Sequence, residues 1–311
     1  MSKVTVVGAG GNVGSTCANT IAHLDIVNEV VMLDINPGNA KGRALDIWQQ
    51  APINYYSTRT VGTDDYADTA NSDIVVITAG IPRKPGMSRD DLIATNAKIV
   101  TSVVENILKH SPNPIIIIVS NPLDVMTYAA FKKSGLAPNR VMGMAGILDT
   151  ARYRAFLAEE LKVSPKDIQA LLMGGHGDDM VPLPRYTTVA GIPVTELIAA
   201  DKLEAIIERT KKGGGELVNL MGTSAWYAPG SAAAQMVEAI VKNENRIFPC
   251  CVYLNGEYGV KDLCVGVPVK LGKNGIEQII EVKLTADEKA LLEKSASQVR
   301  SVVDVLNGMN I

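Results

Sequence analysis

The N-terminal residues contain the pattern that most restricts the fold. A short β-branched run, Lys3 to Val7, leads directly into a glycine-rich turn at residues 8–14, and apolar side chains then recur at helical spacing as far as Leu24. A strand, a glycine turn and a helix in immediate succession are typical of the first unit of a doubly wound α/β sheet. Glycines let the backbone approach a pyrophosphate closely, and the helix N-terminus provides N–H donors. The order of these elements therefore predicts a dinucleotide site.

The glycine spacing departs from the common G-x-G-x-x-G pattern. It aligns as G-x-G-x-x-x-G through Gly8, Gly10 and Gly14, or as G-x-x-G-x-x-G when Gly11 replaces Gly10. The next apolar run ends in Asp34, twenty residues after Gly14. A carboxylate here accepts hydrogen bonds from ribose hydroxyls and repels a 2′-phosphate, which favours NAD over NADP. A turn or helix cap is the alternative reading of Asp34.

The rest of the first half repeats this alternation of strands and helices. The longest expected helix runs from Ser88, its N-cap, to His110. Strands that are apolar throughout indicate a parallel sheet covered by helices on both faces. The further expected strands lie at residues 74–78, 115–119 and 141–144.

The second half has a mixed pattern. A helical region from Thr195 to Leu220 is expected to be interrupted by the glycines at 213–215. Asn255–Gly256 and Asn274–Gly275 mark antiparallel hairpins, and Thr285 with Glu288 forms a capping box for a C-terminal helix. We therefore expect an α/β fold in which a doubly wound parallel sheet, residues 1–145, is followed by a mixed α+β domain, residues 146–311.

Composition excludes several classes of function. The net charge of −3 provides no basic field for nucleic acid or an anionic membrane, and the longest aliphatic run, 115–119, is too short to span a bilayer. The four cysteines form no C-x-x-C pair and fit no zinc pattern, so no metal site is expected. Without a basic N-terminal region or a cleavage site, the chain is expected to be cytoplasmic.

His176 is the histidine with the sequence context of a ligand site. It follows the apolar run 171–173 and two glycines, and Gly177 and Asp178 come next. An apolar run that ends in glycines presents the following side chain at the carboxyl edge of a strand, where ligands bind in open α/β sheets. His23 and His110 lie in helical patterns and are expected to be packed or solvated. On spacing alone, a satisfied loop histidine explains His176 equally well.

Further candidate residues carry charge or an amide near the same edge. Asp149 and Arg152 are three residues apart on one helix face, where one could orient an imidazole and the other could clamp a carboxylate, although Asp149 could equally be a cap. The cationic loop at residues 80–91 is either solvated or a lid over an anionic substrate. Asn121, before Pro122, ends a strand but is also an ordinary turn signal.

Taken together, the glycine turn with Asp34 and the segments RKPGMSRDD, SNPLD, LDTAR and GGHGD resemble the lactate/malate dehydrogenase family over essentially the whole chain. The resemblance implies hydride transfer between NAD and a 2-hydroxy acid, in a homotetramer or a dimer. It implies that His176 is the acid/base and Asp149 its orienting partner. The implied substrate contacts are Arg83, Arg89, Asn121 and Arg152; the implied cofactor contacts are Gly8, Gly10, Gly11, Asn12, Val13, Gly14, Asp34, Asn96, Val119 and Asn121.

Arg83 bears on the choice of substrate. The family typically has glutamine at this loop position in its lactate branch and arginine in its malate branch, so the resemblance implies malate and oxaloacetate. A second fixed positive charge suits a second carboxylate, and leaving it unpaired over a monocarboxylate costs roughly 3–5 kcal/mol. That cost corresponds to about two to three orders of magnitude in discrimination. The one departure, the lengthened glycine turn, resembles the other malate branch.

Three other functions remain open from the residues. A lactate dehydrogenase would use pyruvate. A non-catalytic NAD-binding regulator would bind NADH without turnover, against which the full set of acid/base and arginine residues argues. An NAD-dependent glycosidase on a related fold would need a metal site, which no cysteine–histidine cluster suggests.

Overall fold

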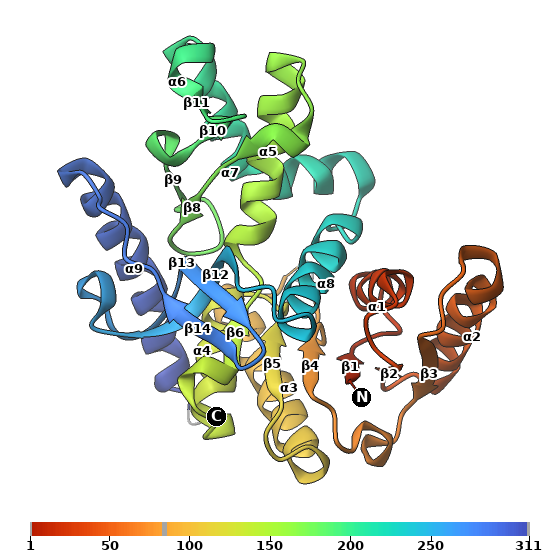
Figure 1. Ribbon diagram of the computed structural model, residues 1–311. Coiled ribbons are helices and arrows are strands. Elements are labelled where there is room, and N and C mark those ends of the chain that lie inside the picture. The colour runs from red at the N-terminus through yellow and green to blue at the C-terminus, as the bar shows by residue number, and fades with distance from the viewer. Residues whose placement is uncertain (1, 83–85, 310–311) are drawn as a thin grey trace.

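A computed structural model describes residues 2–82 and 86–309 of the chain. Its centre is a nine-stranded sheet, as counted over those residues, with the order β14-β13-β12-β6-β5-β4-β1-β2-β3 (Figure 1). The strands of the first half are parallel throughout. They are β1 (Lys3–Val7), β2 (Glu29–Leu33), β3 (Arg59–Thr63), β4 (Ile74–Ile77), β5 (Ile115–Ile118) and β6 (Val141–Gly143).

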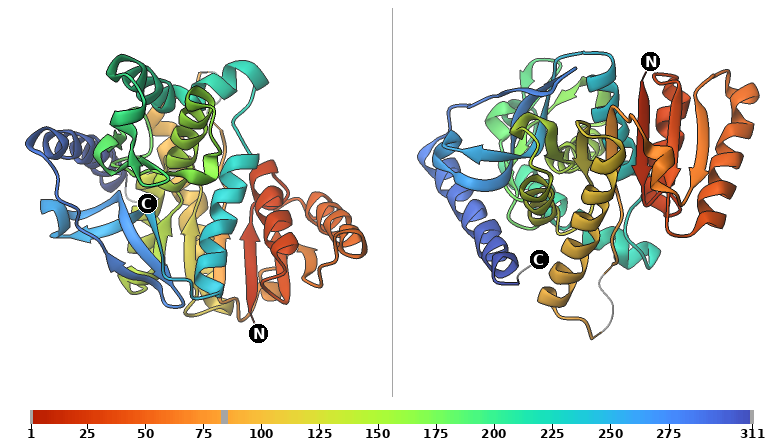
Figure 2. Two further views of the ribbon diagram at one scale, coloured as in Figure 1. Left: turned by 45° about the horizontal axis from the view of Figure 1, so that its top comes forward. Right: turned by 90° about the horizontal axis from the view of Figure 1, so that it is seen from below.

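Helices cover both faces of this sheet, as the apolar strands predict. Every residue of β4 and β5 is buried, because neither face of a doubly covered sheet is open to water. On one face, α1 (Asn12–Leu24) packs between α2 (Pro37–Asn54) and α8 (Tyr227–Val241). On the other, α3 (Arg89–His110), α4 (Leu123–Ser134) and α9 (Ala286–Asn307) pack together (Figure 2). The expected α/β class is confirmed.

Local signals set the ends of two of these helices. Ser88 accepts a hydrogen bond from the backbone N–H of Asp91, and the Asp91 carboxylate accepts from the Ser88 N–H. Thr285 and Glu288 form the same reciprocal capping box at the start of α9. Both caps agree with the sequence prediction, because each box satisfies N–H groups that have no acceptor within the helix.

The second half of the chain extends the central sheet and also forms two small separate sheets. Strands β12 (Arg246–Asn255), β13 (Lys261–Gly272) and β14 (Gly275–Ile279) form an antiparallel meander, and β12 pairs with β6 through Cys251 and Gly143. The remaining elements stand above the sheet in Figure 1. They are α5 (Gly146–Leu161), α6 (Val194–Leu197) and α7 (Ala200–Met221), a three-stranded sheet of β7 (Ile168–Gln169), β10 (Thr188–Val189) and β11 (Ile192–Pro193), and a β8 (Leu172–Met173) and β9 (Val181–Pro182) pair.

The expected interruption at Gly213–Gly215 is wrong, because α7 runs through all three glycines. Gly213 is buried against α5, where a Cβ atom would lie 3.3 Å from Cδ of Arg152. Tertiary packing therefore overrides the low helix propensity of this segment. Five short 3₁₀ helices complete the described chain: η1 (Tyr66–Thr69), η2 (Pro138–Arg140), η3 (Pro165–Asp167), η4 (Pro184–Tyr186) and η5 (Glu257–Gly259). Among the described residues, none of the helices has the length and apolarity that a membrane span requires.

Candidate active site

The structure explains the unusual glycine spacing of the first turn. Gly8 has φ +82°, and a Cβ atom there would lie 2.8 Å from the backbone nitrogen of Ala79. A Cβ atom at Gly14 would lie 2.6 Å from the carbonyl oxygen of Gly8, so the helix packs onto the turn without room for a side chain. Gly11 is the N-cap of α1. The N–H groups of Asn12 and Val13 follow in the first helical turn, where no helical acceptor exists and an anion can bind.

Asp34 organises this turn before any ligand binds. Its carboxylate accepts a hydrogen bond of 2.9 Å from the Gly10 N–H and another of 3.0 Å from the Asn36 N–H. A cavity of about 360 Å³ lies beside it, between the ends of β1, β2 and β4. Ile35 lines this cavity and is 99% exposed. An apolar wall next to a carboxylate fits a base and its ribose, so these residues are suited to the adenosine half of NAD.

The side chain of Asn96 is buried and bonds to the protein backbone, so its role is to hold loops together. It is 2% exposed. Its Oδ1 accepts from the Ile81 N–H, and its Nδ2 donates to the carbonyl oxygens of Ile81 and Asn121. This amide therefore joins the loop after β4 to the loop after β5. Asn121 is exposed, and with Val119 it lines a second cavity nearer the middle of the sheet.

We expected His176 to follow a strand of the central sheet, but it does not. The strand before it, β8, has two residues and pairs with β9 outside that sheet. The loop reaches the sheet through Gly174, which exchanges backbone hydrogen bonds with Gly266 of β13. A Cβ atom on Gly266 would lie 2.4 Å from the Gly174 carbonyl oxygen, so the contact requires glycine. A backbone contact between glycines therefore positions the imidazole.

Three of the predicted residues meet at this loop. Nδ1 of His176 lies 2.8 Å from Oδ2 of Asp149, and Nη1 of Arg152 donates to Oδ1 of the same carboxylate at 3.1 Å. Asp149 and Arg152 project from the same face of α5, as their spacing predicts. Asp149 is 2% exposed, whereas the side chains of His176 and Arg152 each keep 16% exposure toward a cavity. The carboxylate is thus buried between an imidazole and a guanidinium that both remain accessible.

The surroundings favour the protonated imidazole. Burial by itself would lower the pKa of His176, but the charge of Asp149, its hydrogen bond to Nδ1 and the charge of Asp124 outweigh burial and raise that pKa above the ordinary value. Because Asp149 accepts the Nδ1 proton in the neutral form, Nε2 is left as the acceptor. The pair can therefore take a proton from a bound alcohol or return it to an oxyanion.

Two cavities flank the His176 loop. The first, called the dyad cavity here, has about 340 Å³ and is lined by His176, Asp149 and Arg152 from the second half and by Val13 and Asn121 from the first. It connects the imidazole to the N-terminus of α1, where the glycine turn lies. A dinucleotide along the carboxyl ends of the strands would place its nicotinamide in this cavity.

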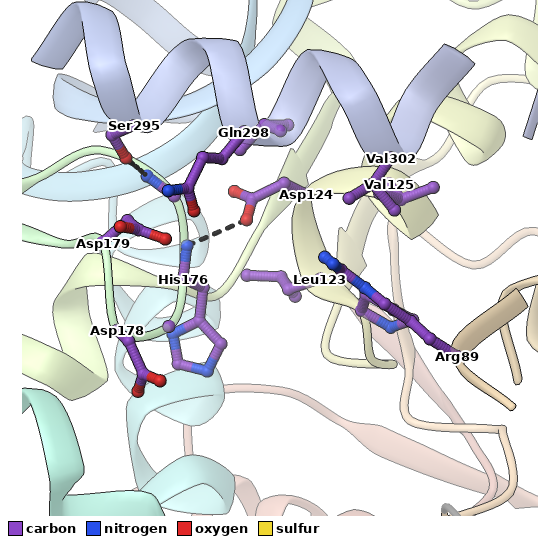
Figure 3. A pocket seen from close by; sticks show the side chains of 14 residues that line it. Arg89, Leu123, Asp124, Val125, His176, Asp178, Asp179, Ser295, Gln298 and Val302 are labelled. Atoms are coloured by element: carbon purple, nitrogen blue, oxygen red, sulfur yellow. Dashed lines mark hydrogen bonds between the residues drawn. The ribbon is translucent and has the colours of Figure 1, made fainter. Parts of the chain in front are cut away.

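The second cavity, called the rear cavity here, also has about 340 Å³ and lies behind the loop, between α4 and α9 (Figure 3). Arg89 lines the rear cavity and not the dyad cavity, with Leu123 between it and His176 in Figure 3. Arg83 lies outside the described residues. Arg152 and Arg89 thus line cavities on different sides of the His176 loop.

Sequence reasoning missed three side chains around His176. Asp124 accepts the backbone N–H of His176, and Ser295 accepts that of Gly175, each at 2.8 Å. Lys211 of α7 lines the dyad cavity. Asp124 belongs to the SNPLD segment, but an acid in the first turn of a helix has an ordinary explanation. Ser295 is 120 residues away in sequence, so no local signal relates it to the loop.

The described residues hold no group of three or more His, Cys, Asp or Glu side chains that could bind a metal ion.

Comparisons with known proteins point to one family. Residues 2–143 match the model of the lactate/malate dehydrogenase NAD-binding domain, and residues 147–307 match that of the lactate/malate dehydrogenase alpha/beta C-terminal domain.

Individual relatives agree with the family models. A malate dehydrogenase of Cytophaga hutchinsonii is 68% identical over 99% of this chain and 98% of its own length. The solved malate dehydrogenase of Salinibacter ruber has a TM-score of 0.95 at 58% identity, covering 99% and 98% of the two chains. A lactate dehydrogenase of Cryptosporidium parvum, solved with lactic acid and nicotinamide adenine dinucleotide, has a TM-score of 0.94 at 38% identity and 98% coverage of both chains. Backbone similarity alone therefore does not separate the two substrates.

Proposed function

The chain belongs to the lactate/malate dehydrogenase family, and we propose that it catalyses reversible hydride transfer between malate and NAD, giving oxaloacetate and NADH. The observation that carries the proposal is the 2.8 Å contact between His176 and the buried Asp149, in a cavity that also contains Arg152. This arrangement places a proton acceptor beside a carboxylate-binding guanidinium. A 2-hydroxy acid needs both groups at adjacent carbon atoms.

The acid/base step follows from the geometry of the pair. In malate oxidation, Nε2 of neutral His176 removes the hydroxyl proton while the C2 hydride departs. NAD, when bound, supplies the acceptor for that hydride. Asp149 keeps the proton on Nδ1 and stabilises the imidazolium that forms, and in oxaloacetate reduction His176 returns the proton to the substrate oxygen.

We assign the substrate contacts as follows. Arg152 binds the C1 carboxylate through its planar fork of N–H donors. Arg89, the first residue of α3, would approach the reacting carbonyl, Arg83 would bind the second carboxylate, and Asn121 would donate a hydrogen bond near the carbonyl. With pyruvate in place of oxaloacetate, Arg83 would have no anionic partner, which favours the dicarboxylate.

We assign the cofactor to the carboxyl edge of the parallel strands. The turn formed by Gly8, Gly10, Gly11, Asn12, Val13 and Gly14 would hold the pyrophosphate at the N-terminus of α1. Asp34 would accept the ribose hydroxyls, Val119 and Asn121 would contact the nicotinamide half, and Asn96 would fix the loops around it. We also propose a domain boundary near residue 145, which divides the chain into residues 1–145 and residues 146–311.

We also propose a homo-oligomer, a tetramer or a dimer. Large apolar side chains are exposed on α2 and on the adjoining ends of α7 and α8, including Trp48 at 40%, Leu220 at 76% and Tyr227 at 71%. Such surfaces are ordinarily buried by a partner, and a second copy of this chain is the proposed occupant. Sedimentation velocity of the purified protein tests this, and a monomer at micromolar concentration would refute it.

We propose a cytoplasmic location as well. The four cysteines are free and buried, which supports a reducing compartment.

The decisive experiment measures the rates at which a panel of 2-oxo acids is reduced by NADH. The loss of NADH absorbance reports each rate. We expect oxaloacetate to be reduced with a kcat/KM about two to three orders of magnitude above that of pyruvate. A preference for pyruvate would establish a lactate dehydrogenase. NADH binding with no turnover on any acid would indicate a non-catalytic regulator.

A further inference from the structure

The loop that carries His176 is held from behind by side chains of two other elements. Asp124 of α4 accepts the His176 N–H, and Ser295 of α9 accepts the neighbouring Gly175 N–H (Figure 3). The packing there leaves no room for side chains at Gly174 and Gly175. A Cβ atom would lie 2.7 Å from Oγ of Ser295 if placed on Gly174, and 2.8 Å from Cγ2 of Val299 if placed on Gly175. The backbone beneath the imidazole therefore depends on α4 and α9.

Asp124 is an unusual choice for this task, because it carries an ionisable group at 6% exposure. Oδ2 accepts the His176 N–H, whereas no N–H or O–H group of the described residues donates to Oδ1; the Cys251 thiol also lies next to this carboxylate. No ion pair to this carboxylate occurs within residues 2–82 and 86–309. A serine or an asparagine could accept the same N–H without the cost of burying a charge. The carboxylate therefore calls for an explanation beyond the hydrogen bond.

The electrostatic relation with His176 supplies that explanation. Burial raises the pKa of Asp124, whereas the His176 N–H bond, the charge of the imidazolium and the neighbouring Cys251 thiol favour its ionised form. In return, the charge of Asp124 contributes to the raised pKa of His176. The carboxylate and the protonated imidazole thus stabilise each other. Asp149 faces the ring edge at Nδ1, and Asp124 lies on the backbone side.

We propose that Asp124 is a positioning residue for the acid/base: it anchors the backbone of His176 and provides a second buried negative charge that stabilises the imidazolium. The inference rests on the proposed function, since it concerns the residue that moves the proton. Asp124 acts through His176 and does not contact the substrate.

Other titratable groups also surround His176, and the test has to separate them from Asp124. Asp149 bonds to the His176 ring, and Arg152 bonds to Asp149. Cys251 lies beside Asp124, and the remaining groups line the two cavities. The whole set comprises Asp149 and Arg152 from α5, Arg89 from α3, Lys211 from α7, Cys251 from β12, and Asp178 and Asp179 from the loop itself. Asp124 differs from these groups because its carboxylate accepts the backbone N–H of His176.

The experiment compares pH profiles of wild type, Asp124→Asn and Ser295→Ala. The asparagine side chain retains an oxygen that can accept the His176 N–H, so the substitution removes charge and keeps the anchor. Ser295→Ala is the matched control, since it removes the neighbouring anchor and changes no charge. For each protein, kcat/KM is measured for oxaloacetate reduction and for malate oxidation across pH, with melting curves and NADH binding to establish folding.

We expect both profiles of Asp124→Asn to move to lower pH, because an imidazole without this charge loses its proton more easily. With each rate expressed as a fraction of that protein's own plateau, oxaloacetate reduction one pH unit above the wild-type midpoint should be about three- to tenfold lower in the variant than in wild type. Malate oxidation should persist correspondingly further into acid. Ser295→Ala should lower the plateau rates and leave the midpoints in place.

Profiles of Asp124→Asn that superimpose on wild type would overturn the proposal and leave Asp124 as a neutral anchor. Asp124→Ser is a second uncharged variant; failure of both to fold would also overturn it, because Asp124 would then serve stability. Absence of oxaloacetate reduction in the wild-type protein would instead reject the proposed function. The two failures are therefore distinguishable.

Discussion

Replacing Asp149 with asparagine tests the proton-transfer arrangement most directly. In the native protein, Oδ2 of Asp149 lies 2.8 Å from Nδ1 of His176 and accepts its proton, which leaves Nε2 free to act. The asparagine amide can turn an N–H toward Nδ1 and so favour the tautomer with the proton on Nε2. A comparable substitution in a Ser–His–Asp triad lowers kcat about 10⁴-fold. Since His176 keeps 16% exposure, we expect a loss of about 10³- to 10⁴-fold, or roughly 4–5.5 kcal/mol of barrier.

The same substitution has a second expected effect. Nη1 of Arg152 donates to the other carboxylate oxygen at 3.1 Å, so Asp149→Asn weakens the hold on the guanidinium that would bind the substrate. The KM for oxaloacetate should therefore rise, by about tenfold if one charge-assisted hydrogen bond is lost. NADH affinity should not change, because the glycine turn and Asp34, to which we assign the pyrophosphate and the adenosine ribose, lie apart from Asp149.

The assay is steady-state oxaloacetate reduction together with a fluorescence titration of NADH. Asp178→Asn is the matched control, because this exposed carboxylate lines the same dyad cavity on the same loop. We expect it to lose less than about tenfold. If Asp149→Asn lost no more activity than Asp178→Asn, Asp149 would not be the orienting partner and the acid/base assignment would fail.

Three further results are expected. Wild-type oxaloacetate reduction needs protonated His176, so its kcat/KM should fall only as pH rises through the raised pKa of that group, above the ordinary value of about 6.5; a midpoint below it would contradict the geometry of the pair. Arg83→Gln should raise the pyruvate-to-oxaloacetate activity ratio by about two orders of magnitude, and an unchanged ratio would remove Arg83 from substrate selection. Gly214→Ala should raise the free energy of unfolding by about 0.5–1 kcal/mol in chemical denaturation, because a Cβ atom there meets no neighbour within 4 Å. Gly213→Ala should give no such gain, because its Cβ atom crowds Arg152. Equal effects of the two substitutions would show that helix propensity alone sets the stability of this segment.

Much of the fold could be predicted because its signals are local. The β-branched run before Gly8, the apolar strands and the capping residues each act through neighbours in sequence, and the structure contains the corresponding elements. The prediction failed where distant contacts decide. Gly213 remains helical because α5 packs against it, and the meander β12–β14 joins the first sheet because β6 offers an open edge to β12.

The same division holds for the site. The sequence context singled out His176, Asp149 and Arg152 as candidates, and the resemblance to the family implied their roles. Their distances were not readable, because tertiary packing of α5 against β8 and β12, and of β8 against β13, brings the two segments together. The role of Asp34 in tying down Gly10 also emerged only from the folded turn.

By itself, the sequence determined the class of fold, the cofactor and the candidate residues for the chemistry, because strand–helix alternation, glycine turns and short motifs each span only a few residues. Only the tertiary structure decided which groups surround the imidazole. Asp124 and Ser295 approach the His176 loop from helices 52 and 120 residues away, and a hydrogen bond over that separation leaves no periodicity or spacing to detect.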